Sequence, residues 1–173
     1  MKVWWFLFWF VCVLPVQADQ FFFGPSLSYR SLTVTQGSVA TEASVTLMDA
    51  RVGMMMSNSF AIGGLYSQIG QKTGATSETR SNLGASVGFM GESALLYFTY
   101  FISSQYEQSA STLKGTGLQV DFAYHFKLSN FKIGPLLSYK QFHYTTSESS
   151  GTESSMDRKD ELVEPYISFL FLF

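Results

Sequence analysis

Hydrophobic and polar residues alternate with a period of two along most of the chain after residue 19. In segment 118–127 every even-numbered position is apolar, while the odd-numbered positions carry Gln, Asp, Ala, His and Lys. Segment 163–173 alternates in the same way, with Val, Pro, Ile and Phe at its odd-numbered positions. Successive side chains of a β-strand point to opposite faces, so this period predicts strands with one apolar and one polar face.

Several segments follow this pattern and are predicted to be strands. The eight strands are residues 20–33, 44–56, 60–70, 81–90, 94–105, 116–127, 131–144 and 162–173. For the third and fifth strands, the face that points inward remains unassigned, because both faces accept bulky residues. The connections alternate between short ones, 57–59, 90–93 and 128–130, and long ones, 34–43, 70–80, 106–115 and 145–161. This order favours an up-and-down antiparallel sheet with tight turns at one end and loops at the other.

The composition decides which face of the predicted sheet points inward. The chain is 46% hydrophobic and 17% aromatic but only 14% charged, so the apolar faces are large. A soluble barrel would place them inside, but an interior of eight strands is barely wide enough for side chains and would be overfilled. Turned outward they would meet lipid, small and polar residues would fill the lumen, and closure would satisfy every backbone group. We therefore predict an all-β fold, an eight-stranded antiparallel up-and-down transmembrane β-barrel with short periplasmic turns and longer extracellular loops.

The N-terminus has the features of a secretory signal peptide. Met1 and Lys2 form a positively charged start before the apolar run 3–14, and small residues at Val16 and Ala18 suit cleavage after Ala18. We predict a signal peptide over residues 1–18 and the barrel over residues 19–173. A retained membrane anchor is the alternative, but the run is too short to span a bilayer comfortably. The only cysteine, Cys12, lies in the predicted signal peptide, so we expect neither disulfides nor thiolate chemistry in the processed chain.

The end of the chain carries a family resemblance. Segment 166–173 ends on Phe, with aromatic or aliphatic residues at alternate positions before it. With the strand count and loop pattern, this ending resembles the small OmpA/OmpX-like outer-membrane β-barrel proteins of bacteria. The resemblance covers residues 19–173 and implies the cell outer membrane of a Gram-negative bacterium, in contact with outer-membrane lipid and lipopolysaccharide. It also implies an assembly signal that the barrel assembly machinery reads through Tyr166, Ile167, Phe169, Phe171 and Phe173.

Charged residues on the predicted inward faces form a candidate lumen charge network. Its members are Arg30, Asp49, Arg51, Asp121, His125, Lys140 and Glu164, and Lys127 and Lys132 share these faces. The last strand should close the barrel between the seventh and the first. We therefore predict that Glu164 lies between Lys140 and Arg30 at about the same height. A buried carboxylate flanked by two cations would gain partners that offset its lost hydration.

These features predict a non-enzymatic barrel with a role in outer-membrane integrity or surface interaction. The lumen charges are expected to plug and orient the interior, and a gate in a narrow pore is the alternative. The net charge of -2 and the lack of a Lys/Arg cluster argue against nucleic acid as a partner. No cofactor or metal is expected, because the two histidines lie on separate strands. We expect a monomer and a mobile, solvated loop over the Ser/Thr-rich segment 145–155.

A lipid A-modifying enzyme is the second alternative. Some small outer-membrane barrels modify lipid A, and a deacylase needs a nucleophile, a base and an orienting acid near the outer leaflet. The candidate sets are His125 with Ser129 and Asn130, and His143 with Tyr144, Ser147 and Glu148. The predicted strands place the first set at the periplasmic end and the second at the extracellular end. Because a loop histidine beside serines is usually just solvated, we predict no catalytic residues.

Overall fold

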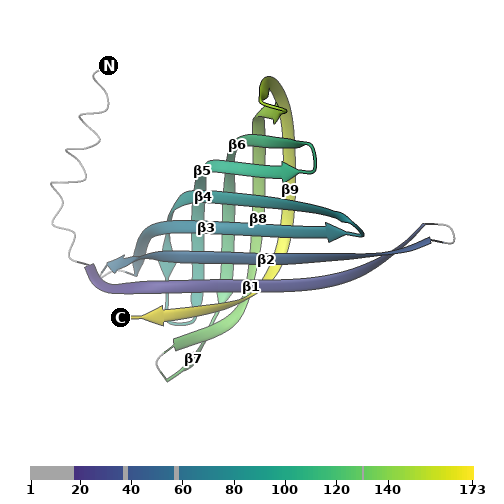
Figure 1. Ribbon diagram of the computed structural model, residues 1–173. Helices are drawn as coiled ribbons and strands as arrows, with labels where there is room; N and C mark the ends of the chain where they lie inside the picture. The colour runs from purple at the N-terminus through teal and green to yellow at the C-terminus, as the bar shows by residue number, and fades with distance from the viewer. Residues whose placement is uncertain (1–17, 37–38, 57–58, 130) are drawn as a thin grey trace, which may run out of the picture.

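The described part of the chain consists of β-strands and their connections, as the computed structural model in Figure 1 shows. It covers residues 18–36, 39–56, 59–129 and 131–173. The strands are β1 (Ala18–Gln36), β2 (Val39–Met56), β3 (Phe60–Thr73), β4 (Thr76–Met90), β5 (Ala94–Gln108), β6 (Ser111–Tyr124), β7 (Phe126–Leu128), β8 (Phe131–Ser149) and β9 (Thr152–Leu172). Within these residues no helix has the length and hydropathy needed to cross a membrane. Residues 1–17, nearly all of the predicted signal peptide, lie outside the described part.

The strands pair in antiparallel fashion and close into a ring. Strands β1 to β5 each pair with the next, β8 pairs with both β6 and β9, and β9 returns to β1. This topology confirms the predicted all-β antiparallel barrel. The predicted strand 116–127 is divided at His125, because β7 continues along β8 where β6 ends, so eight predicted strands become nine. Gly134 lies against this break, where a Cβ would come within 1.8 Å of the Tyr124 carbonyl oxygen.

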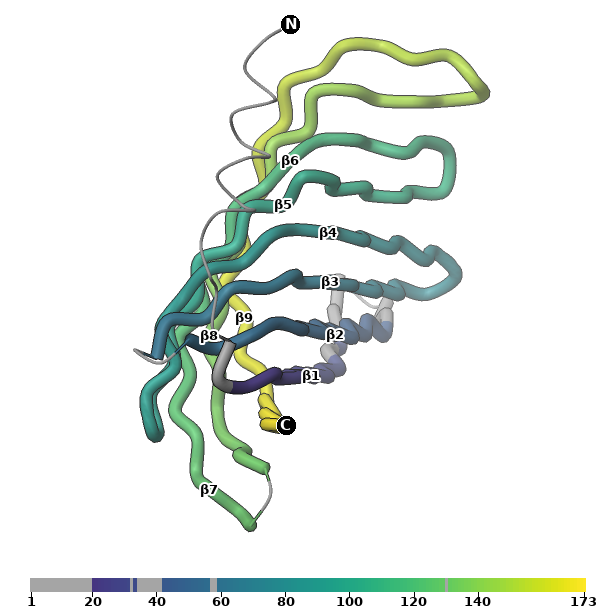
Figure 2. The backbone as a smooth tube through the Cα atoms, turned by 90° about the vertical axis from the view of Figure 1, so that its left-hand side faces the viewer, coloured from purple at the N-terminus to yellow at the C-terminus, as the bar shows by residue number. Residues whose placement is uncertain are grey.

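The segments expected to be long loops are instead strands that lengthen the hairpins. Thr146 pairs with Ser155 and Ser149 with Thr152, so most of segment 145–161 forms a ladder, with one register shift between Tyr144 and Thr146. Ser150 and Gly151 both have positive φ angles, of 50° and 78°, which suits the tight turn of a two-residue hairpin. Figure 2 shows the β3–β4, β5–β6 and β8–β9 hairpins projecting to the same side. Ser and Thr form strands readily once a neighbouring strand pairs with them, so apolar residues are not required.

Large apolar side chains cover the outer face of the barrel. They come from all the strands and include Phe21, Leu27, Val52, Val87, Phe98, Ile102, Phe122, Leu137, Val163, Ile167 and Phe173, each about half exposed or more. Phe169 and Phe171, on the same face of β9, are partly exposed, whereas Leu170 between them is buried. The predicted orientation, with apolar faces outward, is confirmed.

The lumen holds larger side chains than the sequence predicted. In β5, whose faces could not be assigned, Leu95, Tyr97 and Phe101 point inward and are at most 4% exposed. In β3, Leu65 and Ile69 point inward and Tyr66 points outward. Both strands carry bulky residues on both faces, so the lumen is packed with aromatic and aliphatic groups as well as with small and polar ones.

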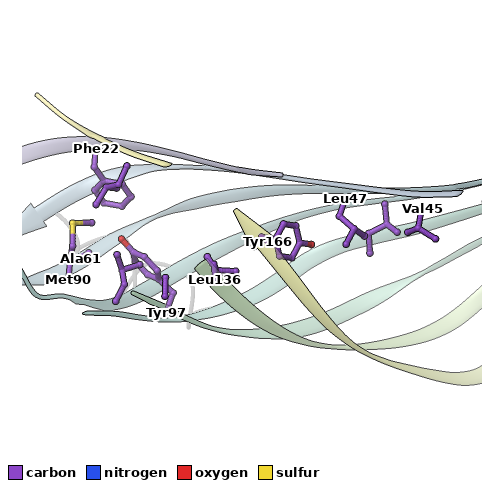
Figure 3. Packing of buried hydrophobic residues seen from close by; sticks show 12 residues of the cluster. Phe22, Val45, Leu47, Ala61, Met90, Tyr97, Leu136 and Tyr166 are labelled. Carbon is purple, nitrogen blue, oxygen red and sulfur yellow. The ribbon is translucent and has the colours of Figure 1, made fainter. Parts of the chain in front are cut away.

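These inward groups form two hydrophobic clusters. Figure 3 shows the first, which runs along the inside of the sheet from Phe22 and Met90 to Leu47 and Val45. The second cluster lies nearer the projecting hairpins and consists of Leu65, Phe101, Leu113, Phe142 and Tyr144. Its rings stack, with the centroids of Phe101 and Phe142 5.8 Å apart. The polar network described next lies among these residues.

Candidate functional site

Five buried charged side chains meet in the lumen. Asp49 and Arg51 come from β2, Asp121 from β6, Lys140 from β8 and Glu164 from β9, and none is more than 5% exposed. All of them occupy inward positions of their strands, next to outward apolar neighbours. The strand alternation thus brings residues far apart in sequence to one place in the interior.

Lys140 is the centre of this lumenal network. Its Nζ lies 3.0 Å from Asp49 Oδ1, 3.6 Å from Glu164 Oε2 and 2.9 Å from the Ser67 hydroxyl. It also donates a hydrogen bond of 2.6 Å to the hydroxyl oxygen of Tyr166. The Tyr166 hydroxyl donates in turn to Glu164 Oε2 at 3.0 Å. The ammonium group therefore has oxygen atoms around it in place of the water that it lost.

A second ion pair joins the network through an amide. Arg51 contacts Asp121 Oδ2 at 2.5 Å, and its guanidinium lies 4.0 Å from the centre of the Tyr97 ring. The Nε2 of Gln119 donates to Asp49 Oδ2 at 3.0 Å and to Asp121 Oδ1 at 2.7 Å. Because Gln119 bridges the two aspartates, the Lys140 and Arg51 centres form one connected unit. Gln119 belongs to the network although the sequence analysis had considered charged residues only.

Of the two ion pairs in the predicted triad, the structure has the one between Lys140 and Glu164. Lys140 and Glu164 lie side by side, as expected for neighbouring strands β8 and β9. Arg30 is exposed and forms no ion pair with Glu164 among the described residues, although both line one small cavity of about 70 Å³. The β1–β9 ladder ends at Leu27 and Ile167, so the two strands separate before they reach the height of Arg30. The prediction of Arg30 as a buried partner is wrong for this reason.

A second charged cluster lies between the lumenal network and the projecting hairpins. Arg80 of β4 contacts Asp160 of β9 at 2.6 Å, and Arg158 contacts the same carboxylate at 2.9 Å. The Arg80 guanidinium also lies 4.5 Å and 4.6 Å from the ring centres of Tyr106 and Phe142. The sequence did not predict this cluster, because residues 80 and 160 fall in segments expected to be loops. Extending the period of two from Asn82 to Arg80 would have identified the inward position.

The other candidate residues lie apart from the network. His125 is buried at the β6–β7 break, and neither of its ring nitrogens has a hydrogen-bond partner among the described residues. His143 is on the outer face, where its Nε2 lies 2.8 Å from Asp157 Oδ1. Lys132 donates to the carbonyl oxygen of Glu92 at 2.7 Å. Asn130 lies outside the described residues. The two histidine-centred sets considered for a deacylase are thus in different surroundings, the lumen and the outer face.

The arrangement of the network suits structural blocking of the lumen. Every charged member has at least one partner of opposite charge, and hydrophobic clusters surround the group. A fixed network of this kind ties β2, β6, β8 and β9 together across the interior. In the described residues no group of three or more His, Cys, Asp or Glu side chains is placed to hold a metal ion.

Comparisons with known proteins find likeness in structure and none in sequence families. No protein-family model and no curated protein sequence matches the chain. OmpT, an outer membrane protein of Vibrio cholerae, has 10% identity and a TM-score of 0.43, over 90% of this chain and 52% of that one. Neisserial surface protein A has 14% identity and a TM-score of 0.47, over 89% of this chain and 97% of that one. The chain spans about half the length of OmpT. Neither likeness defines the family or function of this protein.

Proposed function

We propose that this chain is an integral outer-membrane protein of a Gram-negative bacterium, a plugged β-barrel that serves membrane integrity or contact at the cell surface. The observation that carries the proposal is the inverted distribution of side chains. Large apolar residues cover the outside, while a connected set of buried charges fills the middle of the lumen. A soluble protein rarely exposes apolar area of this extent.

The dimensions of the apolar band support a membrane span. The outward apolar positions run from Val163 of β9 to Phe173, the residue after this strand, and on β5 from Ala94 to Ile102. A tilted strand needs about 9–11 residues to cross the hydrocarbon layer. The β5 segment is paired on both edges, by β4 and β6, and the β9 segment is paired with β8 along its length and with β1 from Ile167 onward, so most of their backbone groups are satisfied, as a chain in lipid requires.

Above this band the outer face becomes polar. His143 pairs with Asp157, and Gln141 donates to Glu161 Oε1 at 3.0 Å. Lys114 lies 2.7 Å from Glu148, and the hydrogen bond to this carboxylate raises the pKa of Lys114. These contacts suit hairpins that stand in water beyond the membrane. Such hairpins would offer a polar, ordered surface to lipopolysaccharide or to another cell.

Export and assembly form part of the proposal. Residues 1–18 would direct export and be removed after Ala18, and the terminal strand would be read by the barrel assembly machinery. On β9, Ile167, Phe169, Phe171 and Phe173 share the outer face, whereas Tyr166 is buried in the lumen beside Lys140. In the folded barrel an outside partner would contact the four outward residues and not Tyr166.

Planar-bilayer recording tests the plugged barrel. Folded protein, identified by a heat-dependent shift in gel mobility, is added to a bilayer, and conductance is recorded over a range of voltages. The packed lumen predicts no steady openings. A variant with Lys140 and Arg51 both replaced by Ala serves as the matched comparison, because its emptied centre should admit ions if it still folds. Steady openings of the wild-type protein would contradict the proposal and favour a narrow pore.

A further inference from the structure

The ring is closed by one short ladder, between β1 and β9. Phe22, Phe23, Ser26 and Leu27 pair with Leu172, Phe171, Ser168 and Ile167, and the pairing ends there. The ladder on the other side of β9 continues along β8 as far as Ser149 and Thr152. Figure 1 shows β9 turning away from β1 beyond this short contact. The barrel wall therefore has one seam, β1–β9, that is open along its upper part.

Pro25 of β1 and Pro165 of β9 lie at this seam. The backbone nitrogen of each, which carries no hydrogen, faces the opposite strand. Phe21 and Phe173 exchange both backbone hydrogen bonds, with N–O distances of 3.2 Å and 2.9 Å. In an antiparallel ladder such pairs recur at every second residue, so Pro25 would face Phe169 and Pro165 would face Tyr29 in the same way. Proline has no N–H to donate. Pairing is interrupted at Pro25 and ends just before Pro165, so the sequence itself weakens this seam.

An apolar cleft occupies the open part of the seam. It has a volume of about 640 Å³, within the roughly 300–1,000 Å³ of small-molecule sites. Its outer lining includes Leu27, Tyr29, Ile167 and Phe169, and its inner lining includes Leu47 and Tyr166. Leu47 is fully buried and Tyr166 is 4% exposed, both in the lumen. Tyr166 therefore keeps a small accessible area at the floor of the cleft, whereas Leu47 lies beneath that floor and is closed to solvent.

We propose that this cleft is a lateral site for one acyl chain of a membrane lipid, whose end lies against Tyr166. The inference rests on the proposed membrane function, because the outer lining continues the apolar band that would face hydrocarbon. Within that band Tyr29, Pro165 and Val163 turn backbone groups toward the gap. Pro165 has no donor, so the cost of leaving this edge unpaired in lipid is reduced.

The same prolines disfavour the other possible occupant, a strand from a second copy of the chain. Strand addition uses a row of free N–H and C=O groups along an edge, and proline on the edge blocks it. A hydrocarbon tail needs no hydrogen bonds from the wall. It matches the lining, which consists mainly of Leu, Ile, Phe, Pro and Tyr side chains.

Photo-crosslinking tests the site. The folded protein is placed in phosphatidylethanolamine–phosphatidylglycerol vesicles that contain a phospholipid with a diazirine at the end of one acyl chain. After illumination, modified peptides are mapped by mass spectrometry. We expect lumenal adducts, on Tyr166, as well as adducts on outward residues such as Phe98 and Leu137. Adducts on outward residues alone would overturn the lateral site and leave the membrane proposal standing, whereas no outward adducts would contradict the membrane proposal itself.

Two variants test whether the acyl chain reaches the lumen through the seam. The double variant Pro25→Val with Pro165→Val restores the donors, so the seam should close and the lumenal adducts should be lost. Pro135→Val is the matched control. Its missing amide faces β6 by the same alternation, so it should keep the lumenal adducts. Persistence of lumenal adducts in the double variant would show that lipid enters elsewhere, and adducts at equal yield in both variants would overturn the proposal.

If the double variant does not fold, a reducible disulfide across the seam provides the same test. Tyr29→Cys with Pro165→Cys places two thiols across the seam, in a chain that has no other cysteine after Cys12. Oxidation should abolish the lumenal adducts and reduction should restore them in the same sample. Disulfide-linked dimers would identify a second copy at the seam and overturn the proposal.

Discussion

Tyr139 and Lys140 are neighbours in β8, yet they occupy opposite surroundings. Tyr139 is 41% exposed on the outer face, whereas Lys140 is fully buried in the lumen among Asp49, Glu164 and Tyr166. The same contrast recurs along the other strands. It shows that this barrel has its apolar surface outside and its charged side chains inside, the reverse of a soluble domain. The outer face and the lumen should therefore respond to different kinds of substitution.

The largest effect is expected at the centre of the network. Replacing Lys140 with Ala leaves Asp49 and Glu164 buried without their cation, and breaking a buried pair in this way costs about 3–5 kcal/mol. The free energy of unfolding can be measured by urea titration in lipid vesicles. Lys127→Ala, on an exposed lysine of β7, is the control and should change it little. Equal stability of the two variants would show that the lumenal contacts do not hold the barrel together.

A charge on the outer face should cost somewhat less. Phe98 is 49% exposed in the middle of the apolar band of β5. Phe98→Arg should lower the free energy of unfolding in vesicles by about 2–4 kcal/mol, the cost of arginine near the bilayer midplane. Phe98→Leu is the control and should be nearly neutral. If Phe98→Arg is tolerated in vesicles as well as Phe98→Leu, this face does not meet hydrocarbon.

The lumenal carboxylate offers a milder test of the network. Glu164→Gln keeps the shape but removes the charge that faces Lys140 and accepts from Tyr166. Lys140 retains Asp49, so we expect a loss of about 1–2 kcal/mol and a lower temperature for the mobility shift of the folded barrel. An unchanged transition temperature would remove Glu164 from the stabilising network.

The smallest effect is expected at Arg30. The sequence alone predicted it as a second partner of Glu164, but it is exposed and unpaired with that carboxylate in the structure. Arg30→Gln should therefore change the free energy of unfolding by no more than about 0.5 kcal/mol. A loss as large as that of Glu164→Gln would restore the three-member triad and mean that the seam closes up to this height.

The sequence was sufficient where the two faces of a strand differ in chemistry. In β6 and in the part of β9 from residue 162 onward the alternation assigned the inward charges Asp121 and Glu164 and the apolar outer face. It failed for β5, because Phe98 and Phe101 are equally bulky and only the packing separates them. The alternation also failed to predict the hairpin extensions, because both faces of these strands carry mostly polar residues and no period of two in hydrophobicity can be seen.

The position of Arg30 depended on information that alternation does not contain. Its distance from Glu164 is set by how far the β1–β9 ladder extends, and this extent follows from the prolines in both strands. Pro25 and Pro165 were visible in the sequence, but their effect depends on which neighbour each missing amide faces. That direction could be assigned only once the Phe21–Phe173 hydrogen bonds were known.

Tryptophan fluorescence in brominated lipid tests the outward orientation most directly. All three Trp residues lie within the predicted signal peptide, so the processed chain would contain none and a single introduced Trp reports on one site. Phe98→Trp and Phe101→Trp place the reporter on opposite faces of β5, where the native side chains are 49% and 0% exposed. In vesicles of phospholipid with brominated acyl chains, we expect strong quenching at position 98 and little at position 101. Equal quenching at both positions, or stronger quenching at 101, would contradict a barrel with its apolar face in the membrane.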